Sequence, residues 1–309
     1  MNVHVTTGRW RLGLALSMVT ALMWGILPVA LKVLLDYMDA FTVTWYRFFG
    51  AAVLMSAFVI RRNSIPPLNK LRKSVISLLL VASAGLCSNY IFYAVGLDHL
   101  PPSTATIVIQ MATVFLLFGS LLIFRERFST GQWAGFLVLL IGLALFFNDR
   151  INELFSRLGE FTTGVLFILA AALLWSVYAL AQKQLLKSFR SETVMLFIFI
   201  SGALLFFPFA RPSIVLNLDG PGFLLLGFCS INTFIAYGSF AEALDHLEAS
   251  RVSMIVATTP VITVVAMKIC SALFPRFIEP EHLNSLSIAG AFIVVAGSMI
   301  CSLGRNNKV

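Results

Sequence analysis

Charged residues are scarce in this sequence of 309 residues, where Asp, Glu, Lys and Arg together make 12% of the chain. A soluble domain carries about 25% charged residues and about 45–50% apolar ones. Here apolar residues make 59%, and the mean hydropathy is +0.92. This balance excludes a soluble globular domain and predicts an integral membrane protein in a lipid bilayer. The formal net charge of +8 is then expected to report loop placement, and no nucleic-acid partner is expected.

Cysteine and histidine are also scarce, with four residues of each. Cys87, Cys229, Cys270 and Cys301 all fall within apolar runs without CxxC spacing, which favours small apolar packing over a disulfide framework or a zinc site. The sequence has no HExxH motif, no GxSxG motif and no histidine at the centre of an apolar run. We therefore expect no enzyme, no catalytic residue, no metal and no cofactor.

What the chain does contain is an internal duplication. The string Leu-Asp-His-Leu occurs at residues 97–100 and again 147 positions later at residues 244–247, with matching Tyr, Ala and Ser residues around it. Gly13–Leu35 aligns without gaps to Gly164–Leu186, and the glycines at 135 and 142 match those at 290 and 297. Matches in the same order with slowly drifting offsets predict two homologous halves with loop insertions.

Ten apolar runs approach the length of about 20 residues that a helix needs to cross a bilayer. They are Leu12–Leu35, Phe41–Ile60, Val75–Leu97, Ser103–Phe124, Gln132–Phe147, Gly164–Leu186, Thr193–Ala210, Gly222–Ala243, Val252–Phe274 and Leu286–Leu303. Five spans per half is an odd number, so the second half must enter the membrane from the opposite side. We expect an all-α integral membrane protein with ten transmembrane helices arranged as two inverted five-helix repeats.

The repeats are predicted to cover residues 1–148 and 164–309, with residues 149–163 between them. In this connection, the apolar residues at 151, 154, 155 and 158 recur at helical spacing, opposite charged residues at 150, 153, 157 and 160. The pattern predicts an amphipathic linker helix on the outer membrane surface.

Lys and Arg placement predicts the orientation, because cytoplasmic loops carry an excess of these residues. With the N-terminus inside, fifteen fall in cytoplasmic segments: Arg9, Arg11, Arg61, Arg62, Lys70, Arg72, Lys73, Arg125, Arg127, Lys183, Lys187, Arg190, Arg251, Arg305 and Lys308. Four fall outside: Arg150, Arg157, Arg211 and Arg276. We expect a multi-pass membrane protein with both termini cytoplasmic.

Inverted repeats with polar residues inside the spans are typical of secondary transporters that work by alternating access. A channel is expected to show a ring of charges or a repeated filter loop, and neither is visible. A passive channel or uniporter is the alternative, and an intramembrane enzyme ranks third. No Asp or Glu lies at the centre of a span, with Glu242 the nearest, which favours a neutral, zwitterionic or anionic small-molecule substrate over a cation.

The chain resembles the ten-helix EamA-type members of the drug/metabolite transporter superfamily. The residues that carry the resemblance are Trp24-Gly25, Pro28 and Lys32 in the first span, Arg47 in the second, and Glu126 nine residues before Gly135. The resemblance implies a carrier of the bacterial inner membrane, most members being exporters of amino acids and other small metabolites. It also implies a central cavity lined by spans 1–4 and 6–9, with spans 5 and 10 outside it. The second half departs from the pattern, since Ile198 stands where Arg47 stands in the first.

Polar and aromatic residues within the lining spans are the candidate substrate contacts. They are Trp24, Asn89, Tyr90, Tyr93, Gln110, Trp175, Tyr178, Gln182, Asn232, Tyr237 and Thr258. Packing is the competing explanation for each aromatic residue, and an interhelical hydrogen bond for Gln110 and Asn232. Pro260 can kink span 9.

Two further expectations concern gating and assembly. Lys32 and Lys183 end equivalent helices, as do Asp98 and Asp245, and an acid at a helix C-terminus opposes the helix dipole. A pair Lys32–Asp98 is therefore expected to close the outer mouth and a pair Lys183–Asp245 the inner one. Glycines at helix-packing spacing, such as Gly131 and Gly135, predict close helix contacts within one chain, as a monomer or in a homodimer.

Overall fold

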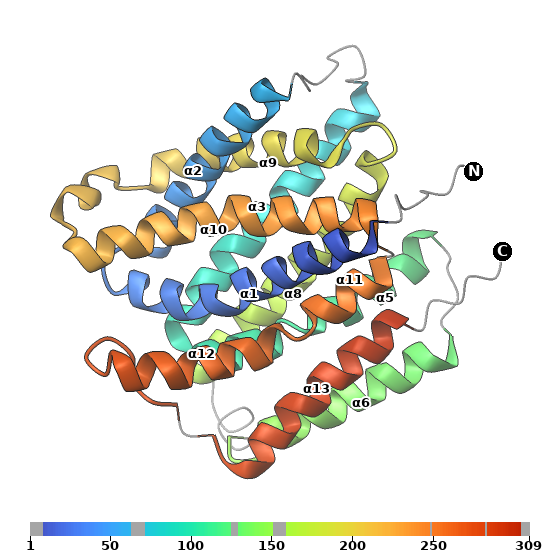
Figure 1. Cartoon of the computed structure of the whole chain (residues 1–309), viewed down its shortest axis with the longest axis vertical. Coiled ribbons are helices and arrows are strands. Elements are labelled where there is room, and N and C mark those ends of the chain that lie inside the picture. Colours follow the sequence, from blue (N-terminus) through green and yellow to red (C-terminus); the bar gives the residue numbers. More distant parts are fainter. Residues whose placement is uncertain are drawn as a thin grey trace.

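The structure is a computed structural model, and it describes residues 9–62, 72–124, 129–150, 159–247, 249–281 and 283–303. These residues form helices and no strand (Figure 1). The helices are α1 (Trp10–Leu35), α2 (Ala40–Arg61), α3 (Lys73–His99), α4 (Pro102–Val108), α5 (Met111–Phe124), α6 (Thr130–Phe146), α8 (Glu160–Leu185), α9 (Ser191–Phe206), α10 (Gly220–His246), α11 (Ala249–Val256), α12 (Thr259–Leu273) and α13 (Ser285–Leu303), with short 3-10 helices at Phe207–Phe209 and Pro212–Asn217.

Nine helical segments in the described part of the chain are long and apolar enough to cross a membrane, and α6 is a shorter apolar helix of 17 residues. Together they correspond to the ten predicted spans, so the prediction of an all-α multi-pass membrane protein is confirmed. The predicted linker helix lies largely at residues 151–158, outside the described residues, and the division into domains stays a prediction.

Several helices begin where the sequence supplies a capping side chain. The Asp39 carboxylate accepts hydrogen bonds from the Phe41 and Thr42 amides at the start of α2, both at 3.0 Å. Asp219 accepts from the Gly222 amide at 2.8 Å and caps α10. These bonds satisfy amides that have no partner within the helix. Acidic residues near these spans therefore have a structural role at helix ends.

Two of the ten spans are broken helices. The chain turns at Ile109–Gln110 between α4 and α5, and at Ala257–Thr258 between α11 and α12. Pro260 lies in the first turn of α12, as expected of the proline in span 9. The break in span 4 has no proline and was not predicted. Gln110 and Ala257 are 147 positions apart, the same separation as the two Leu-Asp-His-Leu strings, so both halves break at the equivalent point.

The duplicated string packs against a glycine of the opposite half. α3 packs along α8, and α10 along α1. A Cβ atom added at Gly164 would lie 2.7 Å from Leu100 Cγ, and one added at Gly13 would lie 2.6 Å from Leu247 Cγ. The end of each copy thus fits only where the facing helix has a glycine near its start. The pairing of helices is unchanged when the halves are exchanged, although the inversion itself stays a prediction.

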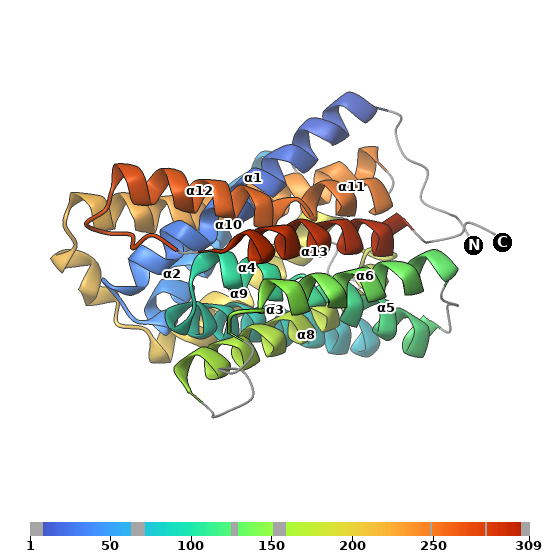
Figure 2. The same cartoon turned by 90° about the horizontal axis from the view of Figure 1, so that it is seen from below.

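Helices α6 and α13 form a close pair at one side of the bundle, visible in both views (Figure 1, Figure 2). The contact is made by the repeated glycines. An added Cβ at Gly142 would lie 2.5 Å from the Val294 amide nitrogen, and one at Gly290 would lie 2.4 Å from the Phe146 amide nitrogen. The expected glycine contact therefore occurs within one chain.

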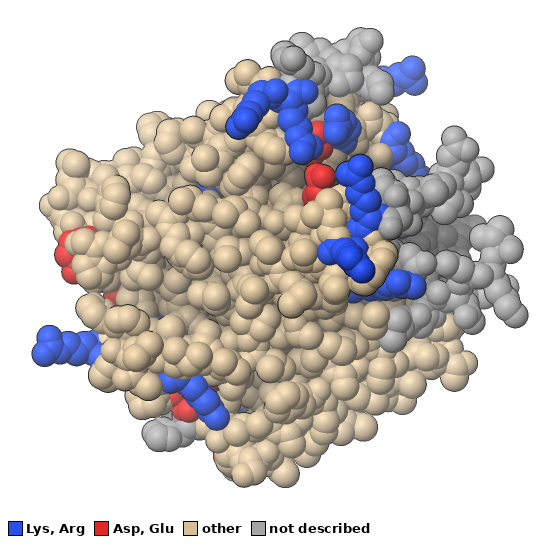
Figure 3. Space-filling model, in the orientation of Figure 1, with Lys and Arg blue, Asp and Glu red and all other residues tan. Residues whose placement is uncertain are grey.

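Lys and Arg gather at one end of the molecule, where α1 begins and α13 ends (Figure 3, right). We call this the basic end. Its described members are Arg9, Arg11, Arg61, Arg62, Arg72, Lys73, Lys183, Lys187, Arg190 and Arg251. The opposite end, formed by the loops after α1, α9 and α12, holds Arg150, Arg211 and Arg276, with Lys32 and Lys268 near it. A membrane protein with unequal ends has an electrostatic basis for a fixed orientation.

Candidate functional site

A cavity of about 180 Å³ lies between the two halves. Its walls come from α1 to α5 in the first half and from α8, α10, α11 and α12 in the second. The lining residues are Trp24, Leu27, Pro28, Arg47, Asn89, Tyr90, Tyr93, Thr106, Ile109, Gln110, Ala112, Thr113, Trp175, Tyr237, Val256 and Thr259. Helices α6, α9 and α13 supply none of these residues. Spans 5 and 10 therefore lie outside the cavity, as the family resemblance implies, but so does α9, which is span 7 and was expected to line it; α9 packs in an apolar core against α2 and α3.

Seven predicted contact residues line the cavity: Trp24, Asn89, Tyr90, Tyr93, Gln110, Trp175 and Tyr237. Four others lie outside it. Tyr178 is 1% exposed and its hydroxyl contacts the Met195 sulfur at 3.3 Å, while Gln182 is buried one turn further along α8. Asn232 is 1% exposed, and the Thr258 hydroxyl donates to the Ile255 carbonyl at 2.6 Å. As substrate contacts, all eleven residues stay predictions.

Aromatic rings form one wall of the cavity. The rings of Trp24 and Tyr237 meet edge to face at 5.3 Å between centroids, and Tyr90 and Tyr237 lie 6.2 Å apart. Tyr178 supports this wall from behind, 6.3 Å from Tyr237 and 6.3 Å from Trp175. Rings in such a cluster hold each other in place, so the wall presents a fixed apolar surface to a ligand.

Gln110 sits where the two broken helices meet. Its Nε2 donates to the Ala257 carbonyl at 3.1 Å, and its Oε1 accepts from the Ser298 hydroxyl at 3.2 Å. The Ser298 hydroxyl is also 3.2 Å from the Thr113 hydroxyl. A carbonyl freed by a helix break needs such a partner in a membrane interior. Gln110 thus joins the breaks of both halves, with one side in the cavity.

Among the described residues that line the cavity, Arg47 has the one charged side chain. It is 4% exposed, and its Nε donates to the Thr233 hydroxyl at 3.2 Å. Its guanidinium carbon lies 4.4 Å from the centre of the Tyr90 ring, in a cation–π contact. The candidate contact residues drawn from the sequence omitted Arg47, although a lone basic residue within a span was a signal for it. Thr106 and Thr113 were also missed.

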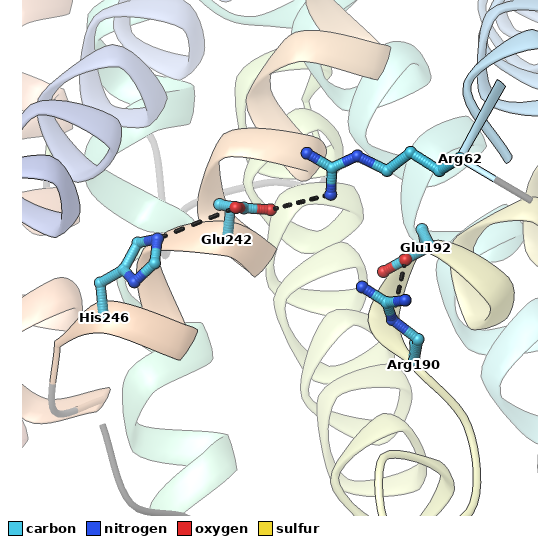
Figure 4. A network of polar contacts seen from close by, with 5 residues as sticks. All are labelled: Arg62, Arg190, Glu192, Glu242 and His246. Atoms are coloured by element: carbon cyan, nitrogen blue, oxygen red, sulfur yellow. Dashed lines mark ion pairs between the residues drawn. The ribbon is translucent and has the colours of Figure 1, made fainter. Parts of the chain in front are cut away.

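The acid nearest to a span centre, Glu242, does not line the cavity. It lies toward the basic end of α10, 3.9 Å from Arg62 and 3.8 Å from His246, with Arg190 and Glu192 paired nearby at 3.0 Å (Figure 4). Its side chain is 41% exposed. No Asp or Glu is among the lining residues of the cavity within the described ranges.

The residues predicted to gate the cavity are only partly described. Lys32 Nζ donates to the backbone carbonyl of Leu97 at 2.9 Å and to that of Asp98, so it binds the C-terminal end of α3. No ion pair joins the Lys32 and Asp98 side chains, both of which are described. Lys183 is exposed at the basic end, and the Asp245 side chain lies outside the described residues. Both gates stay predictions.

A cavity between two halves of a helical membrane protein, beside discontinuous helices, is the arrangement in which secondary transporters bind substrate. The chain matches the family model of the EamA-like transporter family over residues 11–148 and 162–303. It therefore belongs to this family, as the resemblance predicted, and is a membrane transporter.

Several relatives align over almost their full length. The chain is 36% identical over 294 residues to a Haemophilus influenzae protein named as an uncharacterized transporter, covering 95% of each chain. It is 35% identical over 295 residues to the uncharacterized inner membrane transporter YhbE of Escherichia coli, covering 95% of this chain and 92% of the relative. It is 23% identical over 306 residues to a Salmonella typhimurium protein named as a probable amino-acid metabolite efflux pump, covering 94% of each.

Proposed function

We propose that the protein is an inner-membrane secondary transporter that exports a small polar metabolite, an amino acid or a related compound, by alternating access. The cavity between the two halves carries this proposal, because it is lined by nine helices and meets both broken helices at equivalent points. Discontinuous helices at a repeat interface are where secondary transporters bind substrate. The relatives named as an inner membrane transporter and as an amino-acid metabolite efflux pump support the location and the substrate class.

The cavity volume supports a small substrate. Pockets for drug-sized ligands measure about 300–1,000 Å³. At about 180 Å³, this cavity suits a metabolite of amino-acid size better than a large drug molecule. The absence of a lining acid within the described ranges also fits a substrate other than a multidrug cation.

Counterflow in proteoliposomes tests the mechanism. Purified protein is reconstituted with a high internal concentration of each of the amino acids and their close derivatives in turn, and uptake of the same labelled compound is followed. A carrier accumulates the label transiently because internal substrate returns the binding site to the outside. A passive channel or uniporter pore lets the label equilibrate without overshoot, and that result would contradict alternating access.

The proposed orientation places the basic end in the cytoplasm. Ser74, at the start of α3, is exposed at the basic end, and Ser213 is exposed in the loop after α9 at the opposite end. In intact cells, a membrane-impermeant maleimide should label Ser213→Cys and leave Ser74→Cys unlabelled until the cells are permeabilised. The reverse pattern would overturn the orientation and leave the transporter assignment standing.

Gating belongs to the same proposal. Lys32 ties the end of α1 to the end of α3 through backbone carbonyls, on the side opposite the basic end. We place the equivalent contact of Lys183 at the other mouth, formed when this one opens. A reducible bifunctional thiol crosslinker about as long as a lysine side chain, joining cysteines at 32 and 98, should then block counterflow, and reduction should restore it. Full counterflow with the crosslink intact would show that these two helix ends do not separate during transport.

A further inference from the structure

Arg47 has hydrogen-bond donors that no group in the described residues accepts. The guanidinium carries five N–H donors and no acceptor. In the described part of the chain, its hydrogen bond is the one from Nε to Thr233, and its terminal amino groups have no acceptor. The residue is 4% exposed and lines the cavity. The unused donors therefore belong to a buried charge that faces the substrate space.

No acid in the described ranges neutralises this charge. Asp39 and Asp219 cap helices, Glu242 pairs with Arg62 and His246, and Glu281 accepts a hydrogen bond from Thr104. The Tyr90 ring face and the Thr233 hydroxyl offer partial compensation. A buried cation is costly unless an anion pairs with it.

The fold itself does not require a charge at this position. Ile198, the repeat counterpart of Arg47, lies in α9 and is fully buried in an apolar core. The two positions face different surroundings in the same architecture: one packs in the core and the other borders the cavity. The reason for an arginine at position 47 therefore lies in the cavity that it borders.

We propose that Arg47 binds the carboxylate of the transported substrate, so that the substrate class is a small carboxylate or zwitterion whose remaining part contacts Trp24 and Tyr237. This inference rests on the proposed function. The planar guanidinium fork pairs with a carboxylate through two parallel hydrogen bonds, which an ammonium cannot reproduce. Substrate binding then neutralises the cavity, and the aromatic wall accommodates an apolar side chain.

The test measures the sign of the potential in the cavity. Thr113 lines the cavity and is close in size to cysteine, and Cys270 is the half-exposed native thiol. Thr113→Cys in a Cys270→Ser background is treated in detergent, where both faces are accessible, with anionic sulfonatoethyl and cationic trimethylammonium-ethyl methanethiosulfonate. Rates are normalised to those of a free thiol in solution. An unpaired nearby cation should favour the anionic reagent by at least about tenfold.

Matched variants separate the charge from the fold. Arg47→Gln should abolish the preference, Arg47→Lys should retain it, and Arg62→Gln, which changes an exposed arginine at the basic end, should leave it unchanged. If Arg47→Gln does not fold, the preference for the anionic reagent measured with Arg47 intact still shows whether an unpaired cation faces the cavity. Equal normalised rates for the two reagents would overturn the anion site.

Small probes then identify the group that binds. At constant ionic strength, acetate should slow modification of Thr113→Cys and its neutral isostere acetamide should not, and the difference should disappear in Arg47→Gln. If acetate and acetamide slow the modification equally, the carboxylate assignment is overturned. It is also overturned if inorganic phosphate slows the modification and acetate does not. If Thr113→Cys reacts with neither reagent, the cavity is not aqueous and the proposed transport route itself fails. If Thr113→Cys reacts with both reagents at equal normalised rates, the proposed carboxylate site at Arg47 fails and the proposed transport route stands.

Discussion

Asn89 and Asn232 each donate a hydrogen bond to a backbone carbonyl of a neighbouring helix, yet they occupy different environments. Asn89 Nδ2 donates to the Ala171 carbonyl at 2.8 Å, and Asn89 borders the cavity. Asn232 Nδ2 donates to Met23 at 2.7 Å, away from the cavity, and its Oδ1 has no partner among the described residues. A mid-membrane amide can therefore join helices, contact a ligand or do both.

A polar position that lines the cavity and one that is buried between helices should differ in their reactivity when each is replaced by cysteine. Gln110→Cys should react with small water-soluble thiol reagents because Gln110 lines the cavity, whereas Asn232→Cys should stay unreactive because its position is buried between α10 and α1. The measurement is modification followed by mass spectrometry in the Cys270→Ser background. Reaction of both cysteines at similar rates would show that the cavity extends past α1 to Asn232.

Removing the Asn232 bond should have a modest cost. Asn232→Leu keeps the volume of the side chain and loses the bond to Met23, so we expect a loss of about 0.6–1.7 kcal/mol in unfolding free energy. Unfolding in mixed micelles by denaturing detergent measures this. Leu173→Ala, at an exposed position of α8, is a control that should change the free energy less. A stability equal to the wild type would show that the bond contributes nothing.

At the scale of the element, glycines set how closely helices approach. An added Cβ at Gly290 would meet backbone atoms of α6, which cannot move without separating the pair α6–α13. An added Cβ at Gly227 of α10 meets nothing within 4 Å. Small residues at such contacts replace the hydrophobic driving force that helices lack in lipid.

Alanine at these two glycines should therefore act in opposite directions. Gly290→Ala should destabilise the protein by about 1–3 kcal/mol through overpacking. Gly227→Ala should be neutral or stabilising by up to about 1 kcal/mol, because alanine is the better helix former. Detergent unfolding of both variants measures the difference. Similar values for the two would indicate that α6 and α13 do not pack as closely as the structure shows.

The spans could be predicted from the sequence because each is an apolar run of membrane length and most occur twice. The break in span 9 could be foreseen from Pro260, but the break in span 4 could not, because no proline marks it and the bond that joins the two breaks, from Gln110 Nε2 to the Ala257 carbonyl, links residues far apart in the sequence. The cavity face was harder to predict. Tyr178 and Tyr237 are equally aromatic, and helices apolar on all sides leave no periodicity to show which residue faces the cavity.

At the scale of the whole molecule, contacts at the end opposite the basic end link the two halves. Glu281, in the loop between α12 and α13, accepts a hydrogen bond from the Thr104 hydroxyl of α4 at 3.3 Å. Its second carboxylate oxygen is buried without a partner among the described residues. A loop of the second half thus covers the start of a broken helix of the first, and the ionisation of one carboxyl bears on their association.

Burial raises the pKa of Glu281 above its ordinary value, and the neighbouring Ser103 and Thr104 and the charge of Arg150 oppose this only in part. Between the ordinary and the raised pKa, the folded protein holds a proton that the unfolded chain has lost, so stability falls as pH rises through this interval and stays lower above it.

Glu281→Gln cannot ionise and should unfold at a higher temperature than the wild type at neutral pH, with the advantage vanishing in acid. Thr104→Val, which removes an opposing hydrogen bond, should raise the pKa of Glu281 further and extend the decline in stability to higher pH. Thermal unfolding of the three proteins across this pH range measures these effects, and parallel curves for Glu281→Gln and the wild type would show that the carboxyl titrates alike in the folded and unfolded chain.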